Sequence, residues 1–378
     1  MAAYLGYKGK DGYQDFRERF LHQNAESSMT TSVSPASLIK TALHGGANDR
    51  NTLARWLDDN LFDHATFAAL RRQDRPTVWI TASDINNNTP FLFTEDTFAA
   101  LCSDISQMKI AEAVGASAAF PIAFAPMILR TPRTGCNYRR PAWIQRALDA
   151  QNPSIRLQAY ARALDSYQTN RKLDYVRLLD GGLTDNLGIT GLTLQRAASA
   201  TPYGPLSPRE AVRIRNFVFI VTDAGKHSEY EWSRTQIATH LGHVLLAASD
   251  TAIAAATRSG FDAVDLALNE WRHDLIRYRC GLSREQVRKQ RGTLAGWDCR
   301  DVNITTEHLS FRNADADLFE RLNKVPTRLR LSREDVDVVI EAGRQAVRQN
   351  ANIQRIAKEA RSYAPTFDNA QASIALQD

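Results

Sequence analysis

Residues Tyr175–Leu187 read Y-V-R-L-L-D-G-G-L-T-D-N-L, an apolar run that leads directly into an acidic residue and two glycines. The alternating apolar residues at its start predict a buried strand. Asp180 would then lie at the carboxyl end of that strand, where open α/β sheets place their ligands and chemistry. Gly181 and Gly182 predict a tight turn that most residues could not adopt. The stretch therefore predicts an α/β fold with a candidate functional carboxylate.

Four further stretches predict strands. Thr77–Ala82 is β-branched and apolar, and Thr89–Thr94 is expected to return beside it after an asparagine-rich turn. Phe217–Thr222, F-V-F-I-V-T, is the strongest strand signal in the chain. Its continuous apolar run predicts a central strand covered on both faces. Asn303–Phe311 is expected to form another strand.

Helices are expected between these strands. Met1–Tyr7 is apolar and predicts a helix that ends at Gly9. Thr97–Ala119 predicts a second helix, and Pro121 and Pro126 predict that a loop follows it. Ser34–Leu43 predicts a short helix. Glu231–Leu268 predicts one long helix or two, with Gly260 as the break. Ser332–Ala360 predicts a long amphipathic helix, in which Gly343 would allow close approach of a neighbour.

The domain organisation follows from these elements. Residues 1–225 are expected to form one α/β domain, and residues 226–378 a mainly helical extension that packs on the same domain. Residues 133–172 are rich in Arg and Pro, which predicts a surface insertion with one helix near Ala142–Ala150. The last fifteen or so residues are expected to be frayed.

The bulk composition excludes several classes of protein. The charge balance is 47 − 42 = +5, which is too mild for this length to predict nucleic-acid binding, since such binding needs basic residues concentrated on one face. No run of about 18 apolar residues predicts a transmembrane helix, and the first ten residues do not resemble a signal peptide. The compartment is therefore not predicted. Peripheral association with a membrane is compatible with the mild positive charge.

The chain has four cysteines and no C-x-x-C motif, so zinc-ribbon and thioredoxin-like sites are not predicted. Buried or incidental thiols are the first interpretation, and one disulfide between Cys280 and Cys299 is the alternative. The eight histidines form no H-x-x-x-H or H-E-x-x-H pair. His240 and His243 lie three residues apart, but no carboxylate or cysteine is placed to complete a site, so no metal is predicted.

Three segments, in this order, resemble the patatin-like phospholipase family. Thr77–Phe93 contains A-S-D-I-N-N-N-T-P-F-L-F, Ala113–Pro126 reads A-V-G-A-S-A-A-F-P-I-A-F-A-P, and Leu178–Asn186 reads L-L-D-G-G-L-T-D-N. The resemblance implies a three-layer α/β sandwich with a mostly parallel sheet. It also implies a lipid acyl hydrolase that uses a serine and an aspartate without histidine. By this resemblance Asp180 is the base, supported by Gly181 and Gly182.

The other half of that dyad, a serine in a G-x-S-x-G turn, is not present in the sequence. The closest match, Gly115–Ala119, lacks the last glycine and a preceding strand, so Ser117 is not expected to be a nucleophile. His44, Gly45 and Gly46 mimic an oxyanion motif, but a helix C-cap is the favoured interpretation. Within the resemblance, Met1–Tyr7 corresponds to the helix that follows the nucleophile. We therefore expect the N-terminal strands, the oxyanion loop and the nucleophile to be missing from this chain.

Two functional hypotheses follow. In the first, the chain descends from phospholipase A-type acyl hydrolases, retains the base and is inactive as given, with a phospholipid or other acyl ester as substrate and no cofactor. In the second, it is a non-catalytic relative that binds lipid or protein through Leu241–Ala256 and the basic insertion. Loss of internal strands would expose the sheet, so poor solubility or self-association is expected.

Several other polar residues receive structural interpretations. Asp84 is expected to stabilise its turn, and Asp185 and Asn186 to cap the helix at Leu187. A group of arginines in and near the insertion is interpreted as a solvated face, with a patch for anionic lipid headgroups as the alternative. That group comprises Arg130, Arg133, Arg139, Arg140 and Arg146.

Overall fold

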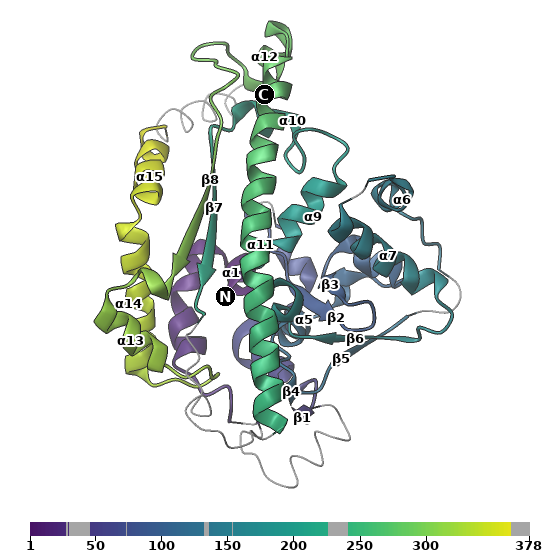
Figure 1. Ribbon diagram of the computed structural model, residues 1–378, viewed down its shortest axis with the longest axis vertical. Coiled ribbons are helices and arrows are strands. Elements are labelled where there is room, and N and C mark those ends of the chain that lie inside the picture. The colour runs from purple at the N-terminus through teal and green to yellow at the C-terminus, as the bar shows by residue number, and fades with distance from the viewer. Residues whose placement is uncertain are drawn as a thin grey trace, which may run out of the picture. The chain divides into compact units, whose positions relative to one another are not determined.

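The computed structural model describes residues 1–27, 29, 46–72, 74–131, 136–152, 154–225 and 241–363 (Figure 1). The chain divides into two compact units. Unit 1 comprises residues 1–205, 231–264 and 327–332, and unit 2 comprises residues 206–230, 265–326 and 333–378. The short helix expected at Ser34–Leu43 and the last fifteen residues lie outside the described residues.

Unit 1 contains a four-stranded sheet in the order β3-β2-β6-β5. The strands are β2 (Thr81–Asp84), β3 (Thr89–Leu92), β5 (Met127–Arg130) and β6 (Tyr175–Leu179). Neighbouring strands in this sheet run antiparallel. Strand β6 is an inner strand, flanked by β2 and β5, so the stretch that predicted the fold lies within the sheet.

Parallel pairing occurs in two further strand pairs. In unit 1, β1 (Gly46–Asn48) pairs with β4 (Ile122–Phe124), and in unit 2, β7 (Asn216–Asp223) pairs with β8 (Asn303–Ser310). The α/β class is therefore confirmed. The described parallel pairs are accompanied by an antiparallel sheet, of which only the return of β3 beside β2 was expected from the sequence.

Helices cover the strands of unit 1. Helix α5 (Ile110–Ser117) is almost entirely apolar, with Ile110, Ala111 and Ala113 fully buried against β2 and α3. The other helices of this unit, including 3-10 and π turns, are α1 (Ala2–Gly12), η1 (Tyr13–Asp15), η2 (Arg17–Leu21), α3 (Thr52–Leu57), η3 (Asp58–Phe62), η4 (Phe67–Leu70), α4 (Glu95–Ala100), η5 (Ile105–Gln107), α6 (Ala142–Asp149), α7 (Ile155–Thr169), α8 (Gly182–Asp185) and α9 (Thr190–Ala198).

Residues 133–172 do not form the surface insertion that their composition predicted. Two helices, α6 and α7, lie in this segment, and α7 buries Leu157, Tyr160, Leu164 and Tyr167 in the core of unit 1. The spacing of these side chains is that of one helix face. The two arginines of α7, Arg156 and Arg162, are exposed, so the arginine content of the segment did not reveal that α7 also has a buried face.

Unit 2 is built on the β7–β8 pair. All eight residues of β7 are in register with β8, from Asn216↔Asn303 to Asp223↔Ser310. The expected central strand at Phe217–Thr222 is present, but the expectation that it is covered on both faces was wrong. Ile220 is 45% exposed, and Val221 is the only buried residue of β7. The described helices that lie wholly within this unit are α10 (Pro208–Arg213), α12 (Arg284–Arg291), the 3-10 helix η7 (Phe311–Asn313), α13 (Ala316–Lys324), α14 (Arg333–Gln349) and α15 (Ala351–Tyr363).

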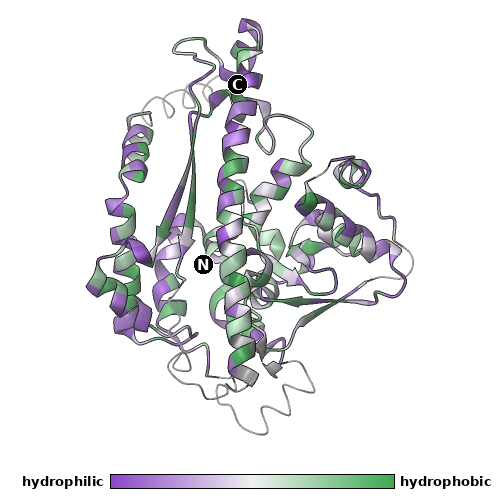
Figure 2. Ribbon diagram, viewed as in Figure 1, coloured by the Kyte–Doolittle hydropathy of each residue, from purple (hydrophilic) through white to green (hydrophobic). Residues whose placement is uncertain are grey.

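Helix α11 (Leu241–Cys280) is continuous over 40 residues. Of the two alternatives expected here, the single helix is confirmed from Leu241 onward, and Gly260 does not break it. Hydrophobic and hydrophilic residues alternate along α11 in Figure 2. In the described parts of the chain, no helix has both the length and the apolar character that crossing a bilayer requires.

Several predicted boundaries were also wrong. Pairing of the first strand begins at Thr81 rather than Thr77, and the helix expected over Thr97–Ala119 is divided into α4, η5 and α5. The loop expected at Pro121–Pro126 contains β4, and Ser332–Ala360 contains two helices that meet at Asn350. The predicted strands at Thr89–Thr94 and Asn303–Phe311 are confirmed.

All four cysteines form disulfides, one in each unit. Cys280 pairs with Cys299, as the alternative interpretation held, and Cys102 pairs with Cys136. The favoured interpretation of unpaired thiols was therefore wrong. The Cys102–Cys136 pair joins the end of α4 to the segment before α6, and no local pattern links two cysteines 34 residues apart.

Candidate functional site

The candidate site begins where β6 ends, at Leu179, so Asp180 occupies the predicted place at the carboxyl end of a strand. Two backbone hydrogen bonds hold this turn against the end of α5. The Asp180 N–H donates to the Ala119 carbonyl at 3.0 Å, and the Gly181 N–H donates to the Ser117 carbonyl at 3.0 Å. The acidic motif and the end of α5 therefore form one rigid corner of unit 1.

The Asp180 carboxylate is half-buried. Its Oδ1 accepts a hydrogen bond of 2.7 Å from the Gly182 N–H, whereas Oδ2 has no hydrogen-bond partner among the described residues. Burial raises the pKa of Asp180, and the Gly182 hydrogen bond opposes that rise only in part. A carboxylate with a raised pKa and one available oxygen is suited to accept a proton.

The two glycines are required for a different reason from the one expected. Gly181 has φ −62° and ψ −29°, an ordinary helical conformation open to any residue. A Cβ on Gly181 would lie 2.5 Å from the Thr81 carbonyl oxygen of β2. A Cβ on Gly182 would lie 3.0 Å from Oδ1 of Asp180. The glycines therefore keep the motif close to β2 and leave space beside the carboxylate, and the expected special turn was wrong.

Ser83 supports the same turn, a role that was not predicted from the sequence. The Ser83 hydroxyl lies 2.7 Å from the Asp180 carbonyl oxygen, to which it donates, and 2.8 Å from Thr184 Oγ1. Ser83 is buried on β2, so it fixes the backbone of Asp180 rather than its carboxylate. Its place directly before Asp84 was the only sequence signal that could have suggested this role.

Asp185 and Asn186 have separate roles. Asp185 accepts hydrogen bonds from the N–H groups of Ile189 and Thr190 at the start of α9, which begins at Thr190 rather than at Leu187 as expected. Asn186 instead donates its side-chain N–H to Thr257 Oγ1 at 3.1 Å. The expected capping role of Asn186 was therefore wrong.

Asp84 has the structural role that was expected of it. The side chain is fully buried and accepts four hydrogen bonds: from the Asn86 and Asn87 N–H groups, the Asn87 side chain and the Tyr167 hydroxyl. The Tyr167 bond, at 2.8 Å, connects the asparagine-rich turn to helix α7. This carboxylate holds its turn and has no oxygen left for chemistry.

The two motifs that resembled parts of a serine hydrolase do not complete the site. Ser117 ends α5, where its carbonyl accepts from Gly181, and no hydrogen bond joins its side chain to Asp180 in the described residues. His44 and Gly45 lie outside the described residues. Gly46 begins β1, so it does not cap a helix as expected.

Of the basic group, Arg140 forms an ion pair with Asp165, and Arg146 donates to the Ala198 carbonyl at 2.8 Å. Both side chains are therefore tied to unit 1 rather than freely presented, and Arg133 lies outside the described residues. Arg130 and Arg139 are exposed, as the solvated interpretation requires.

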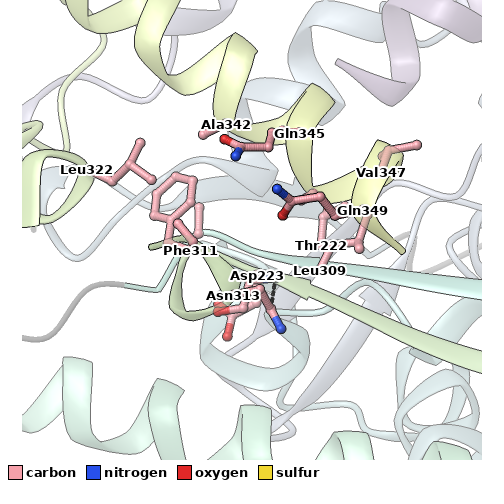
Figure 3. A pocket seen from close by; sticks show the side chains of 15 residues that line it. Thr222, Asp223, Leu309, Phe311, Asn313, Leu322, Ala342, Gln345, Val347 and Gln349 are labelled. Carbon is pink, nitrogen blue, oxygen red and sulfur yellow. Dashed lines mark hydrogen bonds between the residues drawn. The ribbon is translucent and has the colours of Figure 1, made fainter. Parts of the chain in front are cut away.

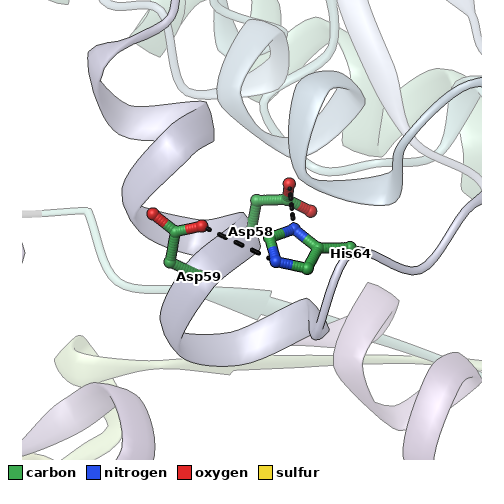
Figure 4. A group of neighbouring side chains, drawn as sticks. All are labelled: Asp58, Asp59 and His64. Carbon is green, nitrogen blue, oxygen red and sulfur yellow. Dashed lines mark hydrogen bonds and ion pairs between the residues drawn. The ribbon is translucent and has the colours of Figure 1, made fainter.

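One cluster of metal-type side chains occurs in the described residues and was not predicted: Asp58, Asp59 and His64 (Figure 4). His64 Nδ1 lies 2.8 Å from Asp58 Oδ2, and the Lys109 ammonium lies 2.6 Å from that same oxygen. Burial alone would raise the pKa of Asp58, but hydrogen bonds from Lys109 and His64 hold it below its usual value. The lysine therefore already supplies the positive charge, and the cluster serves to attach η3 to α5.

The raised pKa of Asp180 gives a stability prediction. The folded chain binds more protons than the unfolded chain between their two pKa values, so stability falls as the pH rises through that window. Asp180→Asn retains an acceptor for Gly182 and has no charge to bury. We expect it to raise the melting temperature near pH 7, with the gain vanishing below the unfolded-state pKa of about 4.

The matched control is Asp104→Asn. Hydrogen bonds from the Ser106 hydroxyl and N–H lower the pKa of Asp104, so removing its charge should not stabilise the chain. Melting curves of both variants and the parent chain, recorded across the pH range, make the comparison. A loss of stability in Asp180→Asn near pH 7 would contradict the prediction.

Comparison with known proteins gives one match. A family model described as patatin-like phospholipase matches residues 1–193, just over half of the 378 residues. No curated protein and no solved structure matches the chain. The matched region contains all three of the motifs on which the resemblance was based, including Asp180.

Proposed function

The chain belongs to the patatin-like phospholipase family, and from this premise we propose that Asp180 is the general base of a Ser–Asp dyad for lipid acyl hydrolysis. The observation that carries the proposal is the state of the Asp180 carboxylate. One oxygen is held by the Gly182 N–H, the other has no partner among the described residues, and burial raises the pKa. The substrate class proposed is a phospholipid or another acyl ester.

The turn after β6 supplies the base of this mechanism. The base removes the proton of a serine hydroxyl as the serine oxygen attacks the ester carbon, and the proton then passes to the leaving alcohol. A pKa raised toward neutrality makes Asp180 a stronger base than an ordinary carboxylate. The N–H groups of Gly181 and Gly182 already donate to Ser117 and Asp180, so they do not serve as oxyanion donors.

The serine is not among residues 1–378 in any G-x-S-x-G motif. We therefore propose that the chain as given does not hydrolyse esters by itself. In serine hydrolases, loss of the nucleophile leaves only the weak catalysis due to binding and the oxyanion hole. No oxyanion loop is recognisable in the sequence, so even this remainder is expected to be lost.

The first test uses the 378-residue chain with a fluorophosphonate probe, a short-chain p-nitrophenyl ester and phosphatidylcholine vesicles. We expect no labelled serine, and turnover equal to that of Asp180→Ala and to the uncatalysed rate. A labelled serine within this chain, with labelling lost in Asp180→Ala, would show that the nucleophile lies in residues 1–378.

The second test uses the protein isolated from its host. A product heavier than the 42.2 kDa of this chain, with a reactive serine, should lose turnover in Asp180→Ala and keep it in Asp104→Ala. Retention of full turnover in Asp180→Ala would overturn the role of Asp180. A product of 42.2 kDa that binds phosphatidylcholine vesicles without labelling or turnover would favour the non-catalytic relative.

A further inference from the structure

A second candidate site lies in unit 2, at the end of the β7–β8 pair (Figure 3). Thr222 and Asp223 end β7, and Leu309 and Ser310 end β8 directly beside them. Because the two strands are parallel, both present their carboxyl ends at this edge, where α/β sheets hold their ligands. A pocket of about 210 Å³ opens there, and every residue that lines it belongs to unit 2.

The walls of the pocket are mainly apolar. They come from the end of β8, the turn after it, α13 and α14. Leu322 is fully buried at one side, and Ala342 is 8% exposed. The apolar side chains that line the pocket are Leu309, Phe311, Leu322, Ala342, Ala346 and Val347. Such walls favour an aliphatic chain or a ring over a polar ligand.

The polar groups of the pocket lie around these walls. Gln345 and Gln349 extend from α14, and their carboxamides have no hydrogen-bond partner among the described residues. Asn313 accepts from the Ser310 N–H through Oδ1, which leaves its side-chain N–H groups available. Three amides can therefore donate to, or accept from, the head of a ligand.

The charge of the pocket limits which polar head group a ligand can have. Among the described residues that line the pocket, Asp223 is the only charged one. Its Oδ1 accepts from the Gly225 N–H, and its Oδ2 lies 3.5 Å from His308 Nε2. A carboxylate beside uncharged amides disfavours an anionic ligand and accepts a neutral one.

We propose that this pocket binds a neutral amphiphile, with a medium-length aliphatic chain among the apolar walls and a hydroxyl, ester or amide head at the three amides. Since a dry cavity of about 150 Å³ is filled by the six carbons of benzene, a pocket of this size takes about eight carbon atoms. The proposal stands on unit 2 alone and does not rest on the catalytic role of Asp180.

Gly343 provides a way to test the pocket by filling it. It lines the pocket from α14, and a Cβ built there meets no atom within 4 Å. The close approach expected at this glycine was therefore wrong, and the first atom of a Gly343→Leu side chain would meet no neighbour. Gly343→Ala is the matched control, because it changes helix propensity in the same direction but leaves the pocket open. Ala346→Leu fills the pocket from the next turn.

The experiment measures binding of 1-octanol and octanoate to the full 378-residue chain by calorimetry, near pH 8, where octanoate is charged. We expect octanol to bind at least about tenfold more tightly than octanoate. We expect Gly343→Leu and Ala346→Leu to abolish octanol binding while Gly343→Ala retains it. Circular dichroism melts confirm that each variant is folded.

Asp223→Asn tests the charge without changing the packing of the walls. It retains an acceptor for Gly225 and should raise octanoate affinity until the preference for octanol is lost. The proposal is overturned if octanol does not bind, if both leucine variants bind it like the parent chain, or if the parent chain prefers octanoate.

Discussion

Asp84→Ala is expected to destabilise unit 1 by about 3 kcal/mol, since one buried donor left unsatisfied costs about 1–3 kcal/mol and charge-assisted bonds are lost as well. The Asp84 carboxylate is fully buried, and the Tyr167 hydroxyl that donates to it belongs to a side chain that is 3% exposed. The backbone N–H groups of the turn are nearer to solvent, so they can donate to water instead. The unsatisfied Tyr167 hydroxyl is therefore expected to cause most of the lost stability. Chemical denaturation measures this loss as a change in the free energy of unfolding.

The variant Tyr167→Phe tests the hydrogen bond separately from packing, because its effect on stability should change sign when Asp84 is absent. In the parent chain, Tyr167→Phe removes one hydrogen bond and should cost about 1 kcal/mol. In the Asp84→Ala background the same change removes the orphaned hydroxyl, so it should stabilise the chain. The two residues are thus expected to couple strongly in a double-mutant cycle. Additive effects of the two changes would show that the Asp84–Tyr167 bond has no such role.

The charge of Asp84 also predicts the behaviour of Tyr167 itself. Burial, followed by the neighbouring carboxylate, raises the pKa of Tyr167 well above its usual value. Tyr167 should therefore remain a phenol, and a hydrogen-bond donor, at neutral pH. This donor state is what makes the bond to Asp84 one-directional.

Gly181→Ala is expected to destabilise unit 1 by about 2–3 kcal/mol, the upper part of the range of about 1–3 kcal/mol for a carbon forced into a packed site. The added Cβ would lie 2.5 Å from the Thr81 carbonyl oxygen. A backbone oxygen in a sheet cannot turn aside as a flexible side chain can, so either β2 or the Asp180 turn must shift. Urea denaturation measures the loss.

Gly260→Ala is the control in the same unit. Gly260 lies in the helical run of α11, and its added Cβ would meet only the tip of the Ile189 side chain, at 3.2 Å. Ile189 can adjust, and alanine is favoured over glycine in a helix by about 1 kcal/mol. We expect this variant to be neutral or stabilised. Equal losses in both variants would mean that the close approach to β2 is not what requires Gly181.

The site was predictable from sequence where its signal is local. A buried strand followed by an acid predicts both β6 and the position of Asp180, and an acidic residue before asparagines predicts the turn at Asp84. The reason for Gly181 was not predictable, because it depends on Thr81, which is one hundred residues away. Ser83 and Tyr167 were missed for the same reason: their roles come from contacts between distant segments.

The fold was predicted less well where composition outweighed periodicity. The spacing of Leu157, Tyr160, Leu164 and Tyr167 is helical, but the many arginines of residues 133–172 favoured an exposed insertion. The apolar run of β7 predicted burial on both faces, whereas burial depends on what packs against a strand. At Gly260 the low helix propensity of glycine suggested a possible break, but α11 continues through it for 40 residues.

Because the chain contains two disulfides, the covalent state of a sample depends on the conditions under which the protein was produced. Cystines form where an oxidant is supplied and are rare where thioredoxin and glutathione keep thiols reduced. Material produced in a reducing cytosol would carry four free thiols in place of Cys102–Cys136 and Cys280–Cys299. Each disulfide restricts the unfolded chain. The loss of one disulfide would therefore lower the stability of the unit that contains it by about 2–4 kcal/mol. A thiol titration of each preparation therefore decides which molecule a melting curve describes.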